Sequence, residues 1–133
     1  MMALQRYVTD THTLFWYLTA SPKLSPTALR AFREAEQGYA TIIVPTLVLA
    51  ELYFLNEKLQ QPLDFALEYQ KMAQSGLFEF ATLDAALVLL LPKLSTIPEM
   101  HDRLIAAVAY REQVPLLTRD DSIRQSGLVA VCW

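Results

Sequence analysis

The 133-residue sequence is poor in the features that mark several common protein classes. Its one cysteine, Cys132, excludes an internal disulfide framework and a cysteine-based zinc site. It has only three glycines, too far apart to form a glycine-rich phosphate loop. The apolar stretch at residues 85–91 is much shorter than the roughly 20 residues that a membrane span requires. Because residues 1–6 also lack the apolar segment of a secretion signal, we expect a cytoplasmic protein.

Charge is also scarce, since only 19% of the residues are charged whereas 53% are hydrophobic. This composition and length predict one folded domain over residues 1–133 with a substantial core. The net charge of −3 and the lack of a basic run give little sign of nucleic-acid binding. A charge inside an apolar stretch is informative, because burying an ionised carboxylate without a counter-charge costs several kcal/mol or more.

Four carboxylates interrupt or adjoin apolar stretches, namely Asp10, Glu51, Asp102 and Asp120. The run around Glu51 contains no lysine or arginine that could neutralise it. If the fold brings the four together, a hard divalent cation is the natural counter-charge, and without it at least one carboxyl pKa should rise. The pattern predicts a metal-dependent enzyme that acts on phosphate esters.

Short β-like runs alternate with helical ones along the chain. Strands are expected at residues 4–9, 40–44, 77–80, 114–118 and 128–132. Helices are expected at residues 12–19, 25–38, 46–59, 62–76, 84–94 and 102–112. This alternation predicts an α/β fold with a parallel sheet covered on both faces. Ligands bind such sheets beyond the carboxyl ends of the strands, and Asp10 and Asp120 both fall just after predicted strands.

Each carboxylate alone also has an ordinary explanation. Asp10 could cap the helix that follows it, and Asp102 could simply favour the positive end of a helix dipole. Asp120 could belong to a solvated turn. Glu51 could share a narrow exposed stripe with Lys58, seven residues further on. Only their combination distinguishes a site from these alternatives.

The sequence also suggests roles for other residues near the carboxylates. His12 is expected to pack or hydrogen-bond near the first strand, and His101 to help cap the following helix. Trp16 has the context of a core residue rather than of a base-stacking platform. Arg103 and Arg119 adjoin the suspected site acids, so they are either phosphate contacts or surface arginines paired with local acids.

The combination resembles a PIN-domain ribonuclease, specifically the VapC-like toxins of bacterial toxin–antitoxin modules. The resemblance rests on four segments in order, residues 10–16, Glu51, residues 101–107 and residues 117–123, with residues 126–129 and Trp133 in support. It implies a PIN-like three-layer α/β/α fold with a parallel five-stranded sheet.

The resemblance also implies an activity, the hydrolysis of RNA phosphodiester bonds with Mg²⁺ or Mn²⁺. The catalytic and metal-binding residues would be Asp10, Glu51, Asp102 and Asp120, with Thr118 in support. Many members carry serine near the start of the helix that holds the second acid, where this chain has Pro45 and Thr46. We therefore rank Glu51 below the three aspartates as a direct metal ligand.

The implied partners are an RNA substrate, a cognate antitoxin protein that covers the active site, and a second copy of the chain in a homodimer. The apolar helices over residues 46–76 could form such surfaces, although a core role is the simpler expectation. Two other functions remain open, a non-catalytic module that binds a partner protein and a haloacid-dehalogenase-like phosphatase with Asp10 as its nucleophile. The phosphatase would need a second aspartate where this chain has His12.

Overall fold

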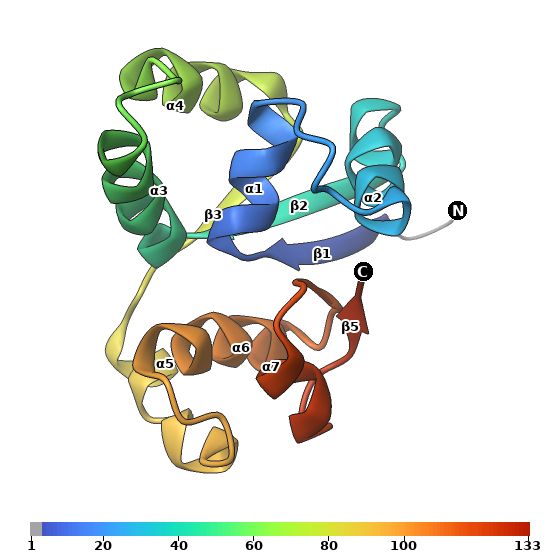
Figure 1. Cartoon of the computed structure of the whole chain (residues 1–133). Coiled ribbons are helices and arrows are strands. Elements are labelled where there is room, and N and C mark those ends of the chain that lie inside the picture. Colours follow the sequence, from blue (N-terminus) through green and yellow to red (C-terminus); the bar gives the residue numbers. More distant parts are fainter. Residues whose placement is uncertain (1–3) are drawn as a thin grey trace.

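The computed structural model describes residues 4–133, and a five-stranded sheet forms its middle layer (Figure 1). The strands are β1 (Gln5–Thr9), β2 (Ala40–Pro45), β3 (Phe78–Ala81), β4 (Leu116–Leu117) and β5 (Val131–Cys132). The helices are α1 (Thr11–Leu18), α2 (Pro26–Glu36), α3 (Thr46–Lys58), α4 (Phe65–Ser75), α5 (Ala85–Val88), α6 (Met100–Glu112) and α7 (Asp121–Ser126), with a 3₁₀ helix η1 (Leu91–Leu94). All the strand pairs are parallel, which confirms the predicted α/β fold.

The strand order β3-β2-β1-β4-β5 places β1 in the centre of the sheet. From β1 the chain first builds outward through β2 and β3, and then returns to add β4 and β5 on the other side. The order therefore reverses between β1 and β4, where the connections diverge and leave room for a ligand. Thr9 is in register with Leu117 across this pair, so Asp10 and Thr118 leave the sheet side by side.

Helices cover both faces of the sheet (Figure 1). Helices α1, α2 and α4 lie on one side, and α5, α6 and α7 lie on the other. Helix α3 contacts both α1 and α6, and so joins the two helical layers. The amino-terminal turns of α1 and α6, together with α3, are thereby brought to one end of the molecule.

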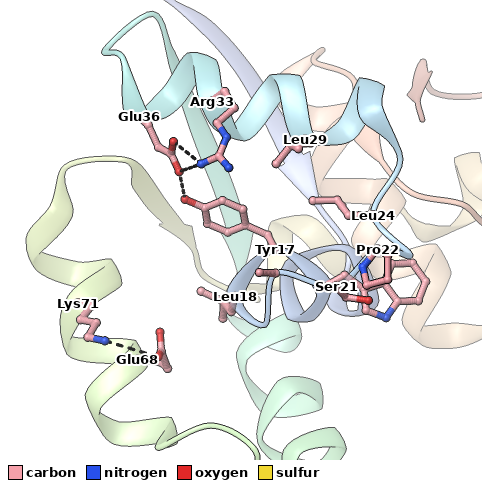
Figure 2. A pocket seen from close by; sticks show the side chains of 12 residues that line it. Tyr17, Leu18, Ser21, Pro22, Leu24, Leu29, Arg33, Glu36, Glu68 and Lys71 are labelled. Carbon is pink, nitrogen blue, oxygen red and sulfur yellow. Dashed lines mark hydrogen bonds and ion pairs between the residues drawn. The ribbon is translucent and has the colours of Figure 1, made fainter.

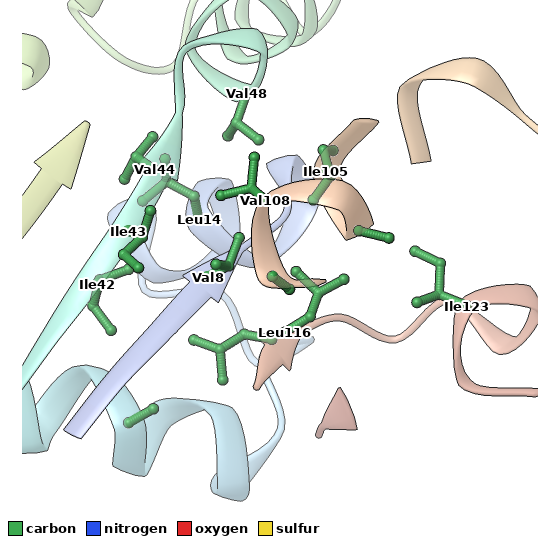
Figure 3. Close-up of a cluster of buried hydrophobic side chains, with 14 of the residues drawn as sticks. Val8, Leu14, Ile42, Ile43, Val44, Val48, Ile105, Val108, Leu116 and Ile123 are labelled. Atoms are coloured by element: carbon green, nitrogen blue, oxygen red, sulfur yellow. The ribbon is translucent and has the colours of Figure 1, made fainter. Parts of the chain in front are cut away.

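The core lies between the sheet and these helices (Figure 3). Ile42, Ile43 and Val44 are consecutive in β2 and have no exposed surface, as expected for a parallel strand covered on both faces. In α6 the run 104–109 is buried throughout and includes three alanines, whose small side chains suit the close packing of α6 against β1. The buried apolar residues thus pack the sheet and helices whose ends carry the four carboxylates.

Several local predictions hold and one boundary shifts. The helix predicted from the Ser25 cap begins at Pro26, with the Ser25 hydroxyl accepting a hydrogen bond from the Ala28 N–H. The helix predicted from residue 62 begins instead at Phe65. Its cap is Asp64, and the preceding turn is held by Asn56, whose side chain donates to the Leu63 carbonyl at 2.9 Å and accepts from the Leu63 N–H at 3.0 Å.

Other predictions from residue 84 onward are corrected. The single helix expected at residues 84–94 is two short pieces, α5 and η1, because Pro92 has no N–H and its ring would clash with the Val88 carbonyl in a continuous helix. Helix α6 begins at Met100 and is capped by Glu99, not by His101. The last two strands are shorter than expected, and α7 replaces the turn expected after Asp120.

No helix within residues 4–133 combines the length and apolar character needed to cross a membrane.

Candidate active site

Asp10 lies where the central strand β1 ends, and both of its carboxylate oxygens are engaged. Oδ1 accepts the Thr13 N–H at 3.0 Å and so caps α1, as the ordinary explanation required. Oδ2 accepts the Thr118 hydroxyl from the neighbouring strand end at 2.5 Å. The cap and the cross-strand bond together fix the direction of the carboxylate, so the capping role is compatible with a place in the candidate site.

Asp120 follows β4 and caps α7. Its Oδ1 accepts the Ile123 N–H at 3.0 Å and the Ser122 hydroxyl at 2.6 Å. Its own N–H donates to the Thr118 hydroxyl oxygen at 3.0 Å. Thr118 is fully buried, and its one hydroxyl links Asp10 and Asp120, so its predicted supporting role remains compatible with this geometry.

Glu51 projects from α3 and is only partly exposed. Its Oε1 accepts the Thr11 hydroxyl at 2.7 Å, which ties α3 to the first turn of α1. A hollow of about 210 Å³ is lined by Glu51 together with Asp10 and Asp102. The side chain thus shares a hollow with two other acids, which the exposed-stripe explanation did not anticipate.

Asp102 lies in the first turn of α6, and its N–H donates to the Glu99 carboxylate that caps this helix. Burial, followed by the nearby charges of Asp120, Glu99, Glu51 and Asp10 in that order of importance, raises the pKa of the Asp102 carboxyl to about 6. The expected rise of at least one carboxyl pKa is therefore present. Glu99 was not recognised in the sequence, although its position three residues before Asp102 is that of a helix cap.

The four acids converge on two adjoining hollows. The first, of about 300 Å³, is lined by Asp10, Asp102 and Asp120. The second is the Glu51 hollow, and the two share Asp10 and Asp102. We call the first of these the acidic hollow. Four segments far apart in the sequence thus contribute one carboxylate each to a single region at the carboxyl end of the sheet.

Whether these residues suit a metal depends on chemistry and on spacing. Within residues 4–133, no three side chains of the metal-binding types stand close enough to surround one ion. Three of the acids also accept hydrogen bonds from the hydroxyls of Thr118, Thr11 and Ser122. Mg²⁺, however, binds hard oxygen ligands and usually keeps several waters, so it needs only one or two protein carboxylates. The oxygen donors fit Mg²⁺ or Mn²⁺, which one or two of Asp10, Asp102 and Asp120 would hold directly and the other acids through water.

His12, Trp16 and Arg119 also border the acidic hollow. The Arg119 guanidinium lies over the Trp16 ring, 4.7 Å from its centroid, and the His12 ring is tilted against the same ring at 5.6 Å. Trp16 is only 6% exposed, as the sequence predicted, whereas His12 is exposed. The sequence signal for this group is the spacing of His12 and Trp16, one helical turn apart on α1.

The two site-adjacent arginines differ. Arg119 borders the acidic hollow, but Arg103 turns to the preceding loop. Its Nε donates to the Ile97 carbonyl at 2.6 Å and its Nη2 to the Ser95 carbonyl at 3.2 Å. Arg103 therefore anchors the loop that leads into α6, a role that neither sequence explanation included.

A larger hollow lies elsewhere, among α1, α2 and α4 (Figure 2). It measures about 570 Å³ and contains none of the four site acids. Tyr17 donates to Glu36 there at 2.5 Å, and Arg33 pairs with the same carboxylate. Burial and then the hydrogen bond to Glu36 raise the pKa of Tyr17. The charged side chains that line this larger hollow are thus paired with one another, and none of its acids belongs to the carboxylate cluster.

Comparisons with known proteins place the chain beside one family. A family model described as the PIN domain matches residues 7–127. Similar solved structures include VapBC2 from Rickettsia felis bound to a DNA fragment from its promoter (18% identity, TM-score 0.72, 96% of this chain and 97% of that chain). They also include FitAcB from Neisseria gonorrhoeae (19% identity, TM-score 0.67, 94% and 95%).

A third similar structure is the Mycobacterium tuberculosis toxin VapC20, which cleaves the sarcin–ricin loop (16% identity, TM-score 0.70, 96% and 99%). No curated protein matches the chain by sequence. At these low identities the structural likeness concerns the fold.

Proposed function

The chain belongs to the PIN-domain family, and we propose that it is a metal-dependent endoribonuclease, the toxin of a bacterial toxin–antitoxin pair. The observation that carries this proposal is the convergence of four carboxylates, from four separate segments, on two adjoining hollows where the strand order reverses. The raised pKa of Asp102 adds support, because after burial its causes include the charges of Asp120, Glu51 and Asp10, which lie near it.

The proposed cofactor is Mg²⁺ or Mn²⁺, held by Asp10, Asp102 and Asp120. When bound, such an ion polarises a phosphate and lowers the pKa of a coordinated water. The Thr118 hydroxyl keeps the Asp10 carboxylate in one orientation and also receives the Asp120 N–H. These contacts would limit the reorganisation needed when substrate arrives.

The remaining side chains of the site suit the handling of protons and charge. The Thr11 hydroxyl donates to Oε1 of Glu51, so Oε2 can orient a water or take a proton from it. The Arg119 guanidinium, placed on Trp16 at the border of the acidic hollow, is suited to phosphate oxygens on which negative charge builds during in-line attack. The expected products carry a 5′-phosphate and a 3′-hydroxyl.

The biological setting follows from the same family. The similar structures VapBC2 and FitAcB support an antitoxin as the cognate partner of this chain. A homodimer and a cytoplasmic location remain predictions. The exposed aromatic residues Tyr53 and Phe54 on α3 are compatible with burial in an assembly.

The test is cleavage of several defined RNAs by the purified chain with Mg²⁺, with Mn²⁺ and with EDTA. We expect cleavage only with an added divalent ion, and none by Asp10→Asn. Metal-independent cleavage, or equal cleavage by Asp10→Asn, would contradict the proposal. If no RNA is cut under any of these conditions, the non-catalytic binding module becomes the better description. A trapped phosphoryl group on Asp10 would instead revive the phosphatase alternative.

A further inference from the structure

A third hollow adjoins the acidic one along helix α1. It measures about 400 Å³ and shares His12, Trp16 and Arg119 with the acidic hollow. Its other polar residues include Lys23 and Lys58, and no aspartate or glutamate lines it. We call it the basic hollow. An acidic and a basic hollow thus meet at one shared border.

The positive charges of the basic hollow form no ion pair with a carboxylate in the described part of the chain. Five of the eleven lysines and arginines form ion pairs with carboxylates, namely Arg6, Arg33, Lys71, Arg111 and Arg124. In the described part of the chain the other six form none, and three of these six are Lys23, Lys58 and Arg119. A chain of net charge −3 therefore gathers half of its unpaired cations in one hollow.

Helix α1 runs from the carboxylates to the basic hollow. Asp10 caps the helix, and His12, Trp16 and Thr19 follow on one face at helical spacing. His12 borders both hollows, whereas Thr19 borders only the basic one. A ligand that spans the two would run beside α1, with one end at the carboxylates and the other near Lys23.

The side chains that line the basic hollow indicate which class of ligand it suits. Trp16 is only 6% exposed and its ring is covered by Arg119 and His12, so it offers little surface for stacking a base. The guanidinium held on that ring is instead pre-oriented toward anionic oxygens. Two lysines beside it add point charges of the kind that bind phosphate. The hollow therefore suits the backbone phosphates of a nucleic-acid strand.

We propose that the basic hollow binds a backbone phosphate of the RNA strand adjacent to the bond held at the carboxylates. Lys23 and Lys58 contact this phosphate, and Arg119 lies between it and the scissile phosphate. This inference rests on the proposed ribonuclease function and extends it to the path of the substrate. It also accounts for RNA binding by an acidic protein, since the contacts are local.

The experiment measures the binding of a single-stranded RNA to the Asp10→Asn protein at several salt concentrations. Each phosphate contact to a single strand contributes about 0.7 to the slope of log K against log salt. Because both lysines contact one phosphate, the added double change Lys23→Ala and Lys58→Ala should lower that slope by about 0.7 and weaken binding roughly tenfold at low salt. In the Asp10→Asn protein the double change should leave the folded fraction, measured by circular dichroism, unchanged.

The matched control removes two other unpaired cations, Arg30 and Lys93, which line neither the acidic nor the basic hollow. The change Arg30→Ala with Lys93→Ala alters the net charge equally and should leave the slope nearly unchanged. Equal losses in both double variants, or an unchanged slope in the Lys23 and Lys58 variant, would overturn the inference. So would a failure of the Asp10→Asn protein to bind RNA at all.

Cleavage by the otherwise unchanged protein separates this inference from the function on which it rests. With Asp10 intact, the Lys23 and Lys58 double change should raise KM more than it lowers kcat. Metal-dependent cleavage with an unaltered KM in that variant would reject the basic hollow and keep the ribonuclease. Slope changes as expected without any cleavage by the unaltered protein would keep the phosphate-binding hollow and reject the ribonuclease.

Discussion

The Thr118 hydroxyl donates a hydrogen bond of 2.5 Å to the Asp10 carboxylate, 108 residues away in the chain. The bond crosses from the end of β4 to the end of β1 and closes the point where the strand order reverses. The same hydroxyl oxygen accepts the Asp120 N–H. One buried side chain thus sets the relative positions of two acids that belong to different connections.

Thr118→Val should test this link directly. Valine keeps the shape of threonine but removes the hydroxyl, so the Asp10 carboxylate loses one anchor and the Asp120 N–H loses its acceptor. Changes to residues that orient metal ligands typically cost 10–100-fold in metal affinity or activity. We expect a loss in this range, measured as cleavage rate against Mg²⁺ concentration. Thr118→Ser retains the hydroxyl and should recover most of the rate, whereas equal losses in both variants would point to packing alone.

Asp10→Asn separates chemistry from folding. The asparagine carbonyl can still cap α1 in place of Oδ1, and its amide N–H in place of Oδ2 can donate to the Thr118 hydroxyl oxygen, while the negative charge is lost. Cleavage should therefore disappear while the metal-free protein stays as stable as before, or becomes more so, because one repelling charge is gone. Asp10→Ala is the control, since it also removes the cap and should cost about 1 kcal/mol in a denaturant titration. An Asp10→Asn protein that cleaves normally but melts far earlier would make Asp10 a structural residue only.

Much of the fold is visible in the sequence because local signals agree with tertiary packing. The Ser25–Pro26 start of α2 is a capping signal that needs no distant partner. Helix α7 was missed because it is short and polar, with one buried apolar residue, Ile123. It depends on the Asp120 cap, and that cap depends on where β4 delivers the chain. Such a helix is fixed by tertiary context rather than by its own pattern.

Only part of the candidate site could be predicted from the sequence. That Asp10 and Asp120 would meet followed from the carboxyl ends of parallel strands sharing one edge. The roles of the arginines did not follow, because Arg103 and Arg119 each adjoin a site acid in the sequence and nothing local distinguishes them. The difference arises from the loop that returns over α6 and from the position of Trp16, both set by chain segments far away.

The Asp102 carboxyl should make the stability of the metal-free protein depend on pH. Its pKa is about 6 in the folded chain, above the ordinary value of 3.8. The folded state therefore binds this proton more tightly, so the favourable contribution is complete below about pH 4 and is lost as pH rises through 6. Melting temperature should fall across this window in EDTA, and added Mg²⁺ should reduce the fall.

Asp102→Asn is the variant that isolates this effect, because the other titrating groups are common to both proteins. At pH 7 in EDTA it should melt higher than the unaltered chain. The carboxyl is partly exposed to water, so we expect a gain of about 1 kcal/mol, or roughly 4 °C. At pH 4 the two proteins should melt at similar temperatures. A difference between them that does not change with pH would mean that Asp102 is not the titrating group.

Arg103→Ala should destabilise the fold without removing a phosphate contact. It deletes the donors to the Ile97 and Ser95 carbonyls, and Ile97 itself is fully buried, so the loop before α6 loses its anchor. Hydrogen bonds from a charged donor suggest a loss of about 1–2 kcal/mol, measured by denaturant unfolding. In the Asp10→Asn background the salt dependence of RNA binding should keep its slope, whereas Arg119→Ala should lower it. If Arg103→Ala lowers the slope by about 0.7 and leaves stability unchanged, Arg103 contacts the RNA backbone instead.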